Sequence, residues 1–246
     1  MNDSPTRQTV VSRLYFICLG YRTFETPAGA RENNYAAYLI QIDDGRNILV
    51  DTGFPEDMQP VDPDGKPWPN VVQQLASIGI APQDVDTLVC THYDLDHCGR
   101  NDAFPNAMQV VQRKQHDEAV RGYERYQRGR AFWDAPHINR QLIDGDYMLA
   151  PGIRLLDTDG HAPGHQSLLV TLPQMGKVLL TIDAVPRRGT FDSNRTDFPM
   201  DEDKAAAAHS MARLVELAES ERPALIVFGH DGPQWRQLSV LPGYYE

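Results

Sequence analysis

Two histidines and two aspartates lie close together in the stretch "THYDLDHCG", residues 91–99. They are His92, Asp94, Asp96 and His97, and they follow a short apolar run. Neutral imidazoles and carboxylates are side chains that bind divalent metal ions in proteins. This combination of residue types therefore predicts a metal site at this point of the chain.

Residues of the same types occur at the ends of other apolar runs. They are Asp51 after "ILV", His92 after "LVCT", His161 after "LLDTDG", Asp183 after "LLTI" and His230 after "IVFG". Residues at strand ends can meet at one edge of a sheet, where the strands hold them rigidly. We therefore expect these five side chains to converge on the same metal site.

The elements that must position these side chains are predicted to be mostly strands. Short runs rich in Val, Ile and Leu indicate strands, and they lie at 13–19, 36–42, 47–53, 86–92, 108–113, 153–158, 166–172, 177–183 and 224–230. Helical patterns cover residues 69–80 and 201–220. Because helices come singly after groups of strands, sheets covered by outer helices are favoured over a doubly wound parallel sheet.

Two segments interrupt this pattern of strands. Residues 54–70 are rich in proline and are predicted to form a loop, and residues 114–148 form an aromatic-rich insertion. Neither segment resembles a linker, so residues 1–246 are interpreted as one domain. Aromatic residues near the insertion either line a substrate pocket or belong to the core; they are Tyr93, Tyr123, Tyr126, Phe132 and Trp133.

Composition excludes several classes of partner. The chain has 246 residues and a formal net charge of −11, whereas binding to nucleic acid or anionic membranes depends on Lys and Arg. No run approaches the ~18 apolar residues of a membrane span, and the first residues do not have the pattern of a secretion signal. The three cysteines (Cys18, Cys90, Cys98) are interpreted as reduced thiols, which predicts a cytoplasmic protein.

Successive motifs of the chain resemble those of the metallo-β-lactamase superfamily. They are "VDTG", "THYDLDHCG", "DGHAPGHQSLL", "LLTIDA" and "FGHD". Within that superfamily, the later motifs are most similar to those of the N-acyl-homoserine lactone lactonases. The resemblance covers roughly residues 12–235. It implies an α+β fold, a four-layer αββα sandwich with two divalent metal ions at one edge, most often zinc.

The resemblance also implies a role for each matching position. The ligands of the first metal would be His92, Asp94 and His161. The ligands of the second metal would be Asp96, His97 and His230. Asp183 would bridge the two ions, whereas Asp51 and His165 would support the ligands without binding metal. His116, His137 and His209 match no motif and are interpreted as ordinary histidines.

The activity implied by the resemblance is metal-dependent hydrolysis. A hydroxide held by two metal ions would attack the carbonyl carbon of a small ester, most plausibly a lactone such as an N-acyl-homoserine lactone. Asp96 would orient the hydroxide and pass a proton to the leaving group. No "GxSxG" motif is present, so nothing indicates a serine nucleophile.

One departure from the lactonase pattern concerns a tyrosine. Lactonases of this kind have a tyrosine three positions after the bridging aspartate, but here that position is Pro186, which has no side-chain donor. Another phenol would have to supply the hydrogen bond to the substrate carbonyl. The candidates are Tyr93, Tyr123, Tyr126 and Tyr147.

The other departure is Asp94, which stands where the family has a histidine. The added carboxylate cancels the net positive charge of a centre with two ions, two aspartates and a hydroxide. It also shifts the metal preference towards harder ions such as Mn²⁺ or Fe²⁺. Flavodiiron proteins resemble this chain in having a carboxylate at that position. Alternatively, Asp94 stays outside the coordination shell and leaves the first site weak.

Several other functions remain open on the same scaffold. Thioester hydrolysis of the glyoxalase II type and phosphoester hydrolysis are the nearest alternatives. A di-iron redox protein is disfavoured because the chain has no second domain for a flavin. A binding protein that has lost turnover is disfavoured because every ligand position holds a residue that can bind metal.

Overall fold

The structure is a computed structural model that describes residues 10–27, 29–194 and 198–246. It contains two mixed β-sheets and several helices. The predicted domain, 1–246, includes residues 1–9, 28 and 195–197, which lie outside the described part of the chain.

The first sheet has six strands, in the order β1-β2-β3-β4-β5-β6. The strands are β1 (Val11–Thr26), β2 (Gly29–Ile42), β3 (Asn47–Val50), β4 (Thr87–Val89), β5 (Met108–Gln112) and β6 (Asn139–Ile143). Strands β1 to β3 pair antiparallel, whereas β3 to β6 pair parallel. The parallel pairing places the ends of β3 and β4, which lead to Asp51 and His92, at the same edge of the sheet.

The second sheet has five strands, in the order β11-β10-β9-β8-β7. The strands are β7 (Tyr147–Ala150), β8 (Ile153–Asp157), β9 (Gln166–Leu172), β10 (Gly176–Ile182) and β11 (Leu225–Phe228). Only β10 and β11 are parallel. Their ends, which lead to Asp183 and His230, are therefore neighbours as well.

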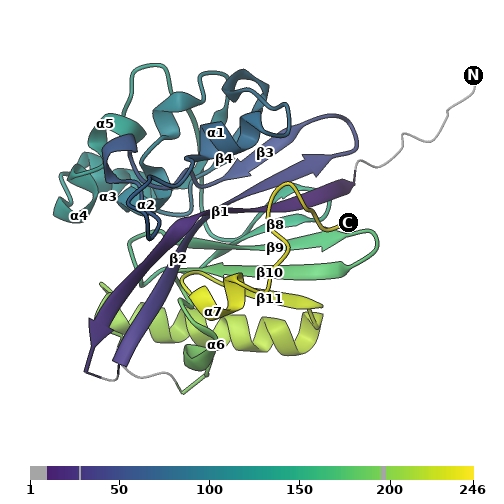
Figure 1. Cartoon of the computed structure of the whole chain (residues 1–246). Helices are drawn as coiled ribbons and strands as arrows, with labels where there is room; N and C mark the ends of the chain where they lie inside the picture. The colour runs from purple at the N-terminus through teal and green to yellow at the C-terminus, as the bar shows by residue number, and fades with distance from the viewer. Residues whose placement is uncertain (1–9, 28, 195–197) are drawn as a thin grey trace, which may run out of the picture.

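Helices cover the outer sides of the two sheets, as Figure 1 shows. Helix α6 (Lys204–Glu221) runs along the second sheet. The helices α1 (Val71–Ala76), α2 (Leu95–Cys98), α3 (Arg113–Val120), α4 (Glu124–Gln127) and α5 (Arg130–Trp133) lie on the side of the first sheet, and the short α7 (Gly232–Trp235) follows β11. This arrangement confirms the predicted four-layer αββα sandwich.

Strand β10 shows why the layers hold together. Val178 and Leu180 belong to the apolar cluster between the two sheets, whereas Leu179 points to the other side and packs with Met211 and Leu214 of α6. Alternate residues of a strand face opposite sides of the sheet. A strand that is apolar on both faces, as this one is, requires a layer on each side.

The same alternation occurs in β1. Leu14 and Phe16 lie in the cluster between the sheets, whereas Tyr15 and Ile17 lie in a second cluster with Leu75 of α1. The first sheet is therefore also covered on both faces. Both sheets are held between packed layers, which makes the strand ends at their common edge a rigid support.

The predicted elements can be compared with the observed ones. Each of the nine predicted strands overlaps an observed strand, and the two predicted helices correspond to α1 and α6. Residues 54–70 contain the short 3-10 turn η1 (Glu56–Met58) and an isolated bridge between Val61 and Pro67 but no named strand or α-helix, which agrees with a loop. Strands β6 and β7 were not predicted, because "NRQLI" and "YMLA" are short and "NRQ" is polar.

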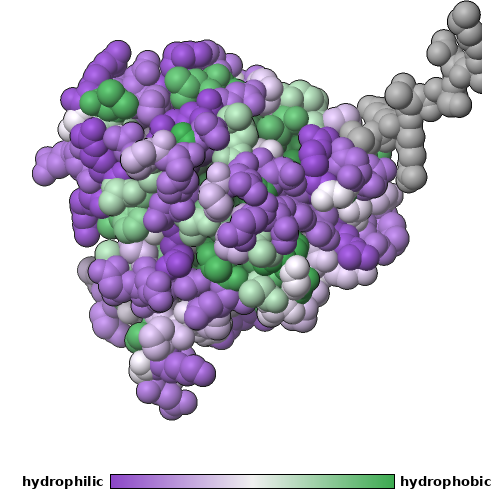
Figure 2. All heavy atoms as spheres, turned by 90° about the horizontal axis from the view of Figure 1, so that it is seen from above, coloured by the Kyte–Doolittle hydropathy of each residue, from purple (hydrophilic) through white to green (hydrophobic). Residues whose placement is uncertain are grey.

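The surface is predominantly polar in the view of Figure 2, with smaller hydrophobic areas among hydrophilic ones. Within the described residues, no helix has both the length and the apolar character needed to cross a membrane. Cys18, Cys90 and Cys98 are unpaired and buried.

Candidate metal centre

The ends of four strands bring the predicted metal-binding residues to one edge of the sandwich. Asp51 directly follows β3, and Asp183 directly follows β10, whereas His92 and His230 come a few residues after β4 and β11. Strands from both sheets thus contribute to one site, as the sequence predicts. Short turns rather than long loops make these connections, so the sheets fix the positions of the side chains.

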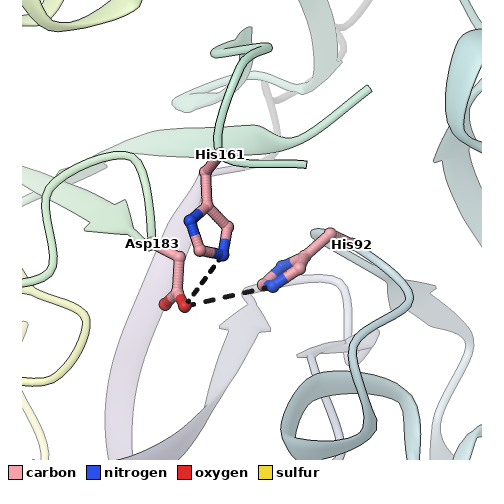
Figure 3. Close-up of side chains that lie close together, drawn as sticks. All are labelled: His92, His161 and Asp183. Atoms are coloured by element: carbon pink, nitrogen blue, oxygen red, sulfur yellow. Dashed lines mark ion pairs between the residues drawn. The ribbon is translucent and has the colours of Figure 1, made fainter. Parts of the chain in front are cut away.

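The first group of potential ligands is His92, His161 and Asp183, whose ligand atoms all lie within 4.8 Å of one another. Figure 3 shows both imidazole rings directed at the Asp183 carboxylate. His161 Nε2 is 3.4 Å and His92 Nε2 is 4.0 Å from Asp183 Oδ2. All three residues are buried.

The second group is Asp96, His97 and His230, whose ligand atoms also lie within 4.8 Å of one another. Asp96 Oδ2 is 3.6 Å from His97 Nε2 and 3.6 Å from His230 Nε2. Asp183 joins this group too, because its Oδ1 is 3.5 Å from His97 Nε2 and its Oδ2 is 3.1 Å from His230 Nε2. Asp183 thus lies between the two groups.

Hydrogen bonds fix which ring nitrogen of each histidine faces the centre. His97 Nδ1 is 2.8 Å from Asp51 Oδ2, and His230 Nδ1 is 2.7 Å from the carbonyl oxygen of Asn34. Both oxygens only accept, so Nδ1 carries the proton in each ring. The Nε2 lone pair of a neutral ring is then directed at the centre, which is the arrangement that metal-binding histidines require.

Asp51 orients His92 as well, through Thr91. The Thr91 hydroxyl donates to Asp51 Oδ2 at 2.7 Å, and the Thr91 backbone N–H donates to Asp51 Oδ1 at 2.8 Å. The hydroxyl oxygen can therefore accept from His92 Nδ1, which is 3.1 Å away. Asp51 is thus linked to two histidines, directly to the His97 ring and through Thr91 to the His92 ring.

His165 holds the backbone of Asp183. The Asp183 N–H donates to His165 Nε2 at 3.2 Å, so the ring proton lies on Nδ1, 2.8 Å from the Thr158 hydroxyl. That hydroxyl continues to Ser167, which donates to the carbonyl oxygen of Thr181. Burial together with the His92 and His161 rings keeps the pKa of His165 well below 6.5, so the ring stays neutral and the chain of hydrogen bonds stays intact.

The backbone is strained at two of these positions. Asp51 has φ 59° and Ile182, next to Asp183, has φ 50°. Residues other than glycine rarely adopt such left-handed conformations, least of all a β-branched residue such as Ile182. A Cβ at Gly229 would lie 2.8 Å from Asp183 Oδ1. The fold tolerates strain where it sets the direction of site carboxylates, as functional sites often do.

The groups polarise one another strongly. Burial raises the pKa of the Asp183 carboxyl, but the His230 and His97 rings outweigh this effect and hold that pKa well below its usual range. Burial lowers the pKa of His230, but the Asp183 and Asp96 carboxylates raise it to about 9. The cluster therefore favours bound positive charge, which protons supply when no metal is present.

Unsatisfied polar atoms show that the residues fit a metal ion. His92 Nε2, His97 Nε2 and Asp183 Oδ1 are buried and have no hydrogen-bond partner. Leaving buried polar atoms unpaired costs free energy, so such atoms need a partner. His92 Nε2 belongs to the first ligand group and His97 Nε2 to the second, and imidazole nitrogens and carboxylate oxygens of this kind suit divalent ions such as zinc.

Asp94 belongs to neither group. Its carboxylate accepts hydrogen bonds from Arg125 Nε at 2.8 Å and from Arg125 Nη2 at 2.6 Å. Burial raises the pKa of the Asp94 carboxyl, but the His92 and His161 rings, together with the Arg125 guanidinium, hold that pKa well below its usual range. The negative charge that distinguishes this chain from the family pattern is thus balanced by Arg125.

A cavity of about 360 Å³ opens over the centre. Polar groups at its base are Asp94, Asp96, His161, Asp183 and His230. The walls combine apolar and polar residues, namely Phe24, Thr26, Arg31, Asn33, Tyr35, Pro186, Arg187, Phe198 and Met200. A site of this kind, mostly apolar with a few convergent polar groups, suits a small organic molecule.

The aromatic residues considered for the pocket lie elsewhere. Tyr93, Tyr126 and Trp133 are completely buried in one apolar cluster, with Tyr93 stacked on Trp133 at 4.9 Å between ring centroids.

The remaining aromatic residues lie outside the cavity as well. Tyr123 packs against that cluster, and Phe132 lines a separate cavity beside Glu56. Tyr147 lies on β7, where its hydroxyl accepts from Gln141. These side chains form core or surface rather than the wall above the centre.

Tyr35 supplies the phenol at the cavity wall. It lies on β2, its ring centroid is 5.4 Å from that of His230, and burial raises its pKa to about 12. Neither Tyr35 nor Arg125 was singled out from the sequence. Tyr35 lies upstream of the first motif and belongs to none of them. For Arg125 there was a signal, because a carboxylate such as that of Asp94 needs a cation as its partner when it is partly removed from water.

Residues that match no motif also lie outside both groups. His116 contacts Trp133, and His137 Nε2 contacts the carbonyl oxygen of Asp102. Cys98 Sγ donates to the carbonyl oxygen of Tyr93, which agrees with a packing role. None of these, nor His209, belongs to either group of potential ligands among the described residues.

Comparisons with known proteins agree with this geometry. The model of the metallo-beta-lactamase superfamily matches residues 30–230. An N-acyl homoserine lactonase of Bacillus thuringiensis is 34% identical over 95% of this chain and 99% of its own length. Another, from Azorhizobium caulinodans, is 37% identical over 71% of this chain and 69% of its own.

A solved structure shows the same relationship in three dimensions. An N-acyl homoserine lactone hydrolase with the product N-hexanoyl-L-homoserine bound at its catalytic metal center superposes with a TM-score of 0.82. It is 34% identical, and the match covers 96% of this chain and 100% of that one. With the fold, the two groups of ligands and these matches in agreement, the chain belongs to the metallo-beta-lactamase superfamily and, within it, to the family of the N-acyl homoserine lactonases.

Proposed function

We propose that this chain is a metal-dependent hydrolase that opens the ring of N-acyl homoserine lactones. The observation that carries the proposal is the pair of ligand groups that share Asp183 at the base of a cavity of about 360 Å³. The family relationship supports the lactone, because relatives that match nearly the whole chain are N-acyl homoserine lactonases.

The proposed ligands follow the two groups. His92, His161 and Asp183 would hold one ion, and Asp96, His97 and His230 would hold the other, with Asp183 shared. Divalent ions at such a site lower the pKa of water and stabilise negative charge on a carbonyl oxygen. The donors are histidine nitrogens and aspartate oxygens, a combination that favours zinc. Arg125 balances the negative charge of Asp94. The presence of Asp94 is therefore a weaker reason to expect Mn²⁺ or Fe²⁺ than it would be without this arginine.

The protein's own residues would perform the remaining steps. Asp96 lies at the base of the cavity and would hold the attacking water and accept its proton. As the ring C–O bond breaks, the same carboxyl would return that proton to the leaving oxygen. The Tyr35 phenol, which stays protonated because its pKa is about 12, would donate to the lactone carbonyl in place of the absent tyrosine at position 186.

Apolar residues of the cavity would receive the acyl chain. Phe24, Phe198 and Met200 line the wall, and their side chains offer apolar surface. Burial of an acyl chain is worth roughly 0.8 kcal/mol per methylene. We therefore expect kcat/KM to rise with acyl length until this wall is filled.

A substrate panel tests the proposal. Zinc-loaded protein is given N-hexanoyl homoserine lactone, a hexanoyl thioester and an aryl phosphate, and kcat/KM is measured for each. The lactone should exceed the others by about 10-fold or more. Faster hydrolysis of the thioester or the phosphate would assign the site to one of those substrates.

A phosphoester is the second candidate, and one observation favours it. Arg31 and Arg187 both line the cavity, so an anionic group could be bound there. Arg187 already contacts the backbone carbonyl of Glu32 and the side chain of Asn33, which engages part of its guanidinium. The aryl phosphate in the same panel decides between the two candidates.

A further inference from the structure

Arg125 enters the first ligand group from helix α4. Its Nη2 is 2.6 Å from Asp94 Oδ2 and 2.8 Å from His161 Nε2, and its Nη1 donates to the His161 carbonyl oxygen at 2.8 Å. The side chain is only 19% exposed. The guanidinium is thus bound by the Asp94 carboxylate, the His161 ring and the His161 carbonyl oxygen, and it lies against residues that would bind the first metal.

The contact with His161 Nε2 has a chemical consequence. A guanidinium N–H is only a donor, so the imidazole nitrogen must be the acceptor and must use its lone pair. That nitrogen has a single lone pair, whereas a carboxylate oxygen has more than one. His161 can therefore bind either Arg125 or a metal ion, but Asp94 can bind both at once.

The distances place Arg125 Nη2 against atoms that are spaced to share a metal ion. Asp94 Oδ2 is 3.4 Å from His92 Nε2 and 3.8 Å from His161 Nε2. Ligands at about 2.0–2.1 Å from one tetrahedral ion are roughly 3.4 Å apart. These atoms are spaced to share an ion with Asp183, yet Arg125 Nη2 is bonded to two of them.

The second group has no such competitor. Within the described part of the chain, no arginine or lysine donates a hydrogen bond to Asp96, His97 or His230. His97 Nε2 is buried and has no hydrogen-bond partner. In the second group, therefore, no guanidinium or ammonium group competes with a metal for these atoms, whereas Arg125 engages the Nε2 lone pair of His161 in the first group.

We propose that Arg125 is a displaceable cation at the first metal position, so that the two metal sites fill in sequence. The second group fills first, and the first group fills only when the guanidinium leaves His161 Nε2. Asp94 then keeps Arg125 beside the centre or joins the ligands. This inference rests on the proposed metal centre, and it explains why a chain with aspartate at position 94 also has an arginine that reaches it.

Metal titration of the whole protein tests the proposal. Metal-free wild type, Arg125→Gln and Arg128→Gln are titrated with Zn²⁺, and both binding steps are measured by calorimetry and by metal analysis after dialysis. Arg128 is the matched control, because it is exposed and lies on the same short segment. Arg128 lines a cavity beside Asp94 and Asp96, but among the described contacts it donates no hydrogen bond to either ligand group. Its substitution therefore removes the same charge without removing a hydrogen bond to a ligand.

The wild type should bind one equivalent tightly and the second more weakly. Arg125→Gln should tighten the second step roughly 10-fold to 100-fold and leave the first unchanged, because a charged hydrogen bond no longer competes. Arg128→Gln should resemble the wild type. Two equivalents of equal affinity in the wild type, or a second step unchanged in Arg125→Gln, would overturn the proposal.

Nitrogen chemical shifts of the histidine rings give a readout independent of affinity. The first equivalent of Zn²⁺ should shift His97 and His230 and leave His161 unchanged, and the second should shift His161. A first equivalent that shifts His161 contradicts the order of filling. Absence of metal binding in every variant, with folding verified by circular dichroism, would contradict the proposed metal centre itself, so the two failures are distinguishable.

Discussion

At the scale of single residues, the centre depends on side chains that never touch the metal. Asp51 binds His97 directly and His92 through Thr91, and His165 binds the backbone N–H of Asp183. Each contact determines which nitrogen of a histidine ring carries the proton. For His97 and His92 it leaves Nε2 directed at the centre. The supporting residues should therefore affect metal affinity more than they affect folding.

Substituting Asp51 tests this view. In Asp51→Asn, an amide replaces the carboxylate that accepts from His97 Nδ1, so the preferred tautomer of the ring is no longer enforced. Zinc affinity, measured by competition with a chromophoric chelator, should fall roughly 10-fold to 100-fold. Asp57→Asn, at an exposed carboxylate, is the control and should bind as the wild type does. Equal affinities in the two variants would refute the role of Asp51.

The pKa of His230 predicts proton release on metal binding. In the metal-free protein this pKa is raised to about 9, so the ring is mostly protonated at pH 7.5. A metal ion requires the neutral ring and must displace the proton. Zinc affinity should therefore rise with pH up to about 9. Calorimetry in two buffers of different ionisation enthalpy measures the released protons, and heats that do not depend on the buffer would contradict this assignment.

At the scale of elements, β2 contributes more than strand pairing. It carries Tyr35 to the cavity wall and Asn34 to His230. A strand with its position fixed by pairing to both β1 and β3 can hold a phenol close to the centre. Position 186, where the lactonase pattern has a tyrosine, is a proline in this chain. Strand β2 instead places a phenol, that of Tyr35, at the cavity wall.

Replacing this phenol tests the role of β2. Tyr35→Phe removes the donor to the lactone carbonyl and should lower kcat roughly 10-fold to 100-fold, with a smaller change in KM. Tyr93→Phe is the matched control, because that phenol is completely buried away from the cavity and its hydroxyl has no partner. If Tyr93→Phe loses as much activity as Tyr35→Phe, the assignment of Tyr35 is wrong.

The elements also show how far sequence alone could lead. Apolar runs predicted the strands that end at Asp51, Asp183 and His230, since burial on both faces leaves a clear pattern. Strand β6 has a mixed pattern and pairs only at the edge of its sheet, so local composition did not reveal it.

The same distinction holds for the centre. Residue types at strand ends predicted that His92, Asp183 and His230 would meet, and these side chains do lie close together. The partnership of Asp94 with Arg125 was not, because it joins residues far apart in sequence through a segment of short helices with no regular period. Likewise, no pattern within β2 distinguishes Tyr35 from the other tyrosines of the chain.

At the scale of the whole molecule, one apolar cluster joins the two sheets. Phe16 and Val50 of the first sheet pack in it with Leu168 and Leu180 of the second. The metal centre lies where the same sheets end, so its geometry depends on their relative position. We propose on this basis that the chain is a single cooperative domain.

Unfolding experiments test this cooperativity. Leu180→Ala should lower the free energy of unfolding by about 2–5 kcal/mol, because a fully buried side chain is lost. Far-UV and near-UV circular dichroism should show one coincident transition in both the wild type and the variant. Two separate transitions, with only one shifted by the substitution, would show that the sheets belong to independently folding parts.

Removal and return of the metal test the central claim most directly. N-hexanoyl homoserine lactone hydrolysis is measured in the purified protein, after chelation, and after reconstitution with Zn²⁺, alongside Asp183→Asn with its metal content determined. We predict that activity disappears on chelation, returns with zinc and is absent in Asp183→Asn, which should retain less metal. Lactone hydrolysis that persists in the metal-free protein, or that is absent from the zinc-loaded wild type, would contradict the account.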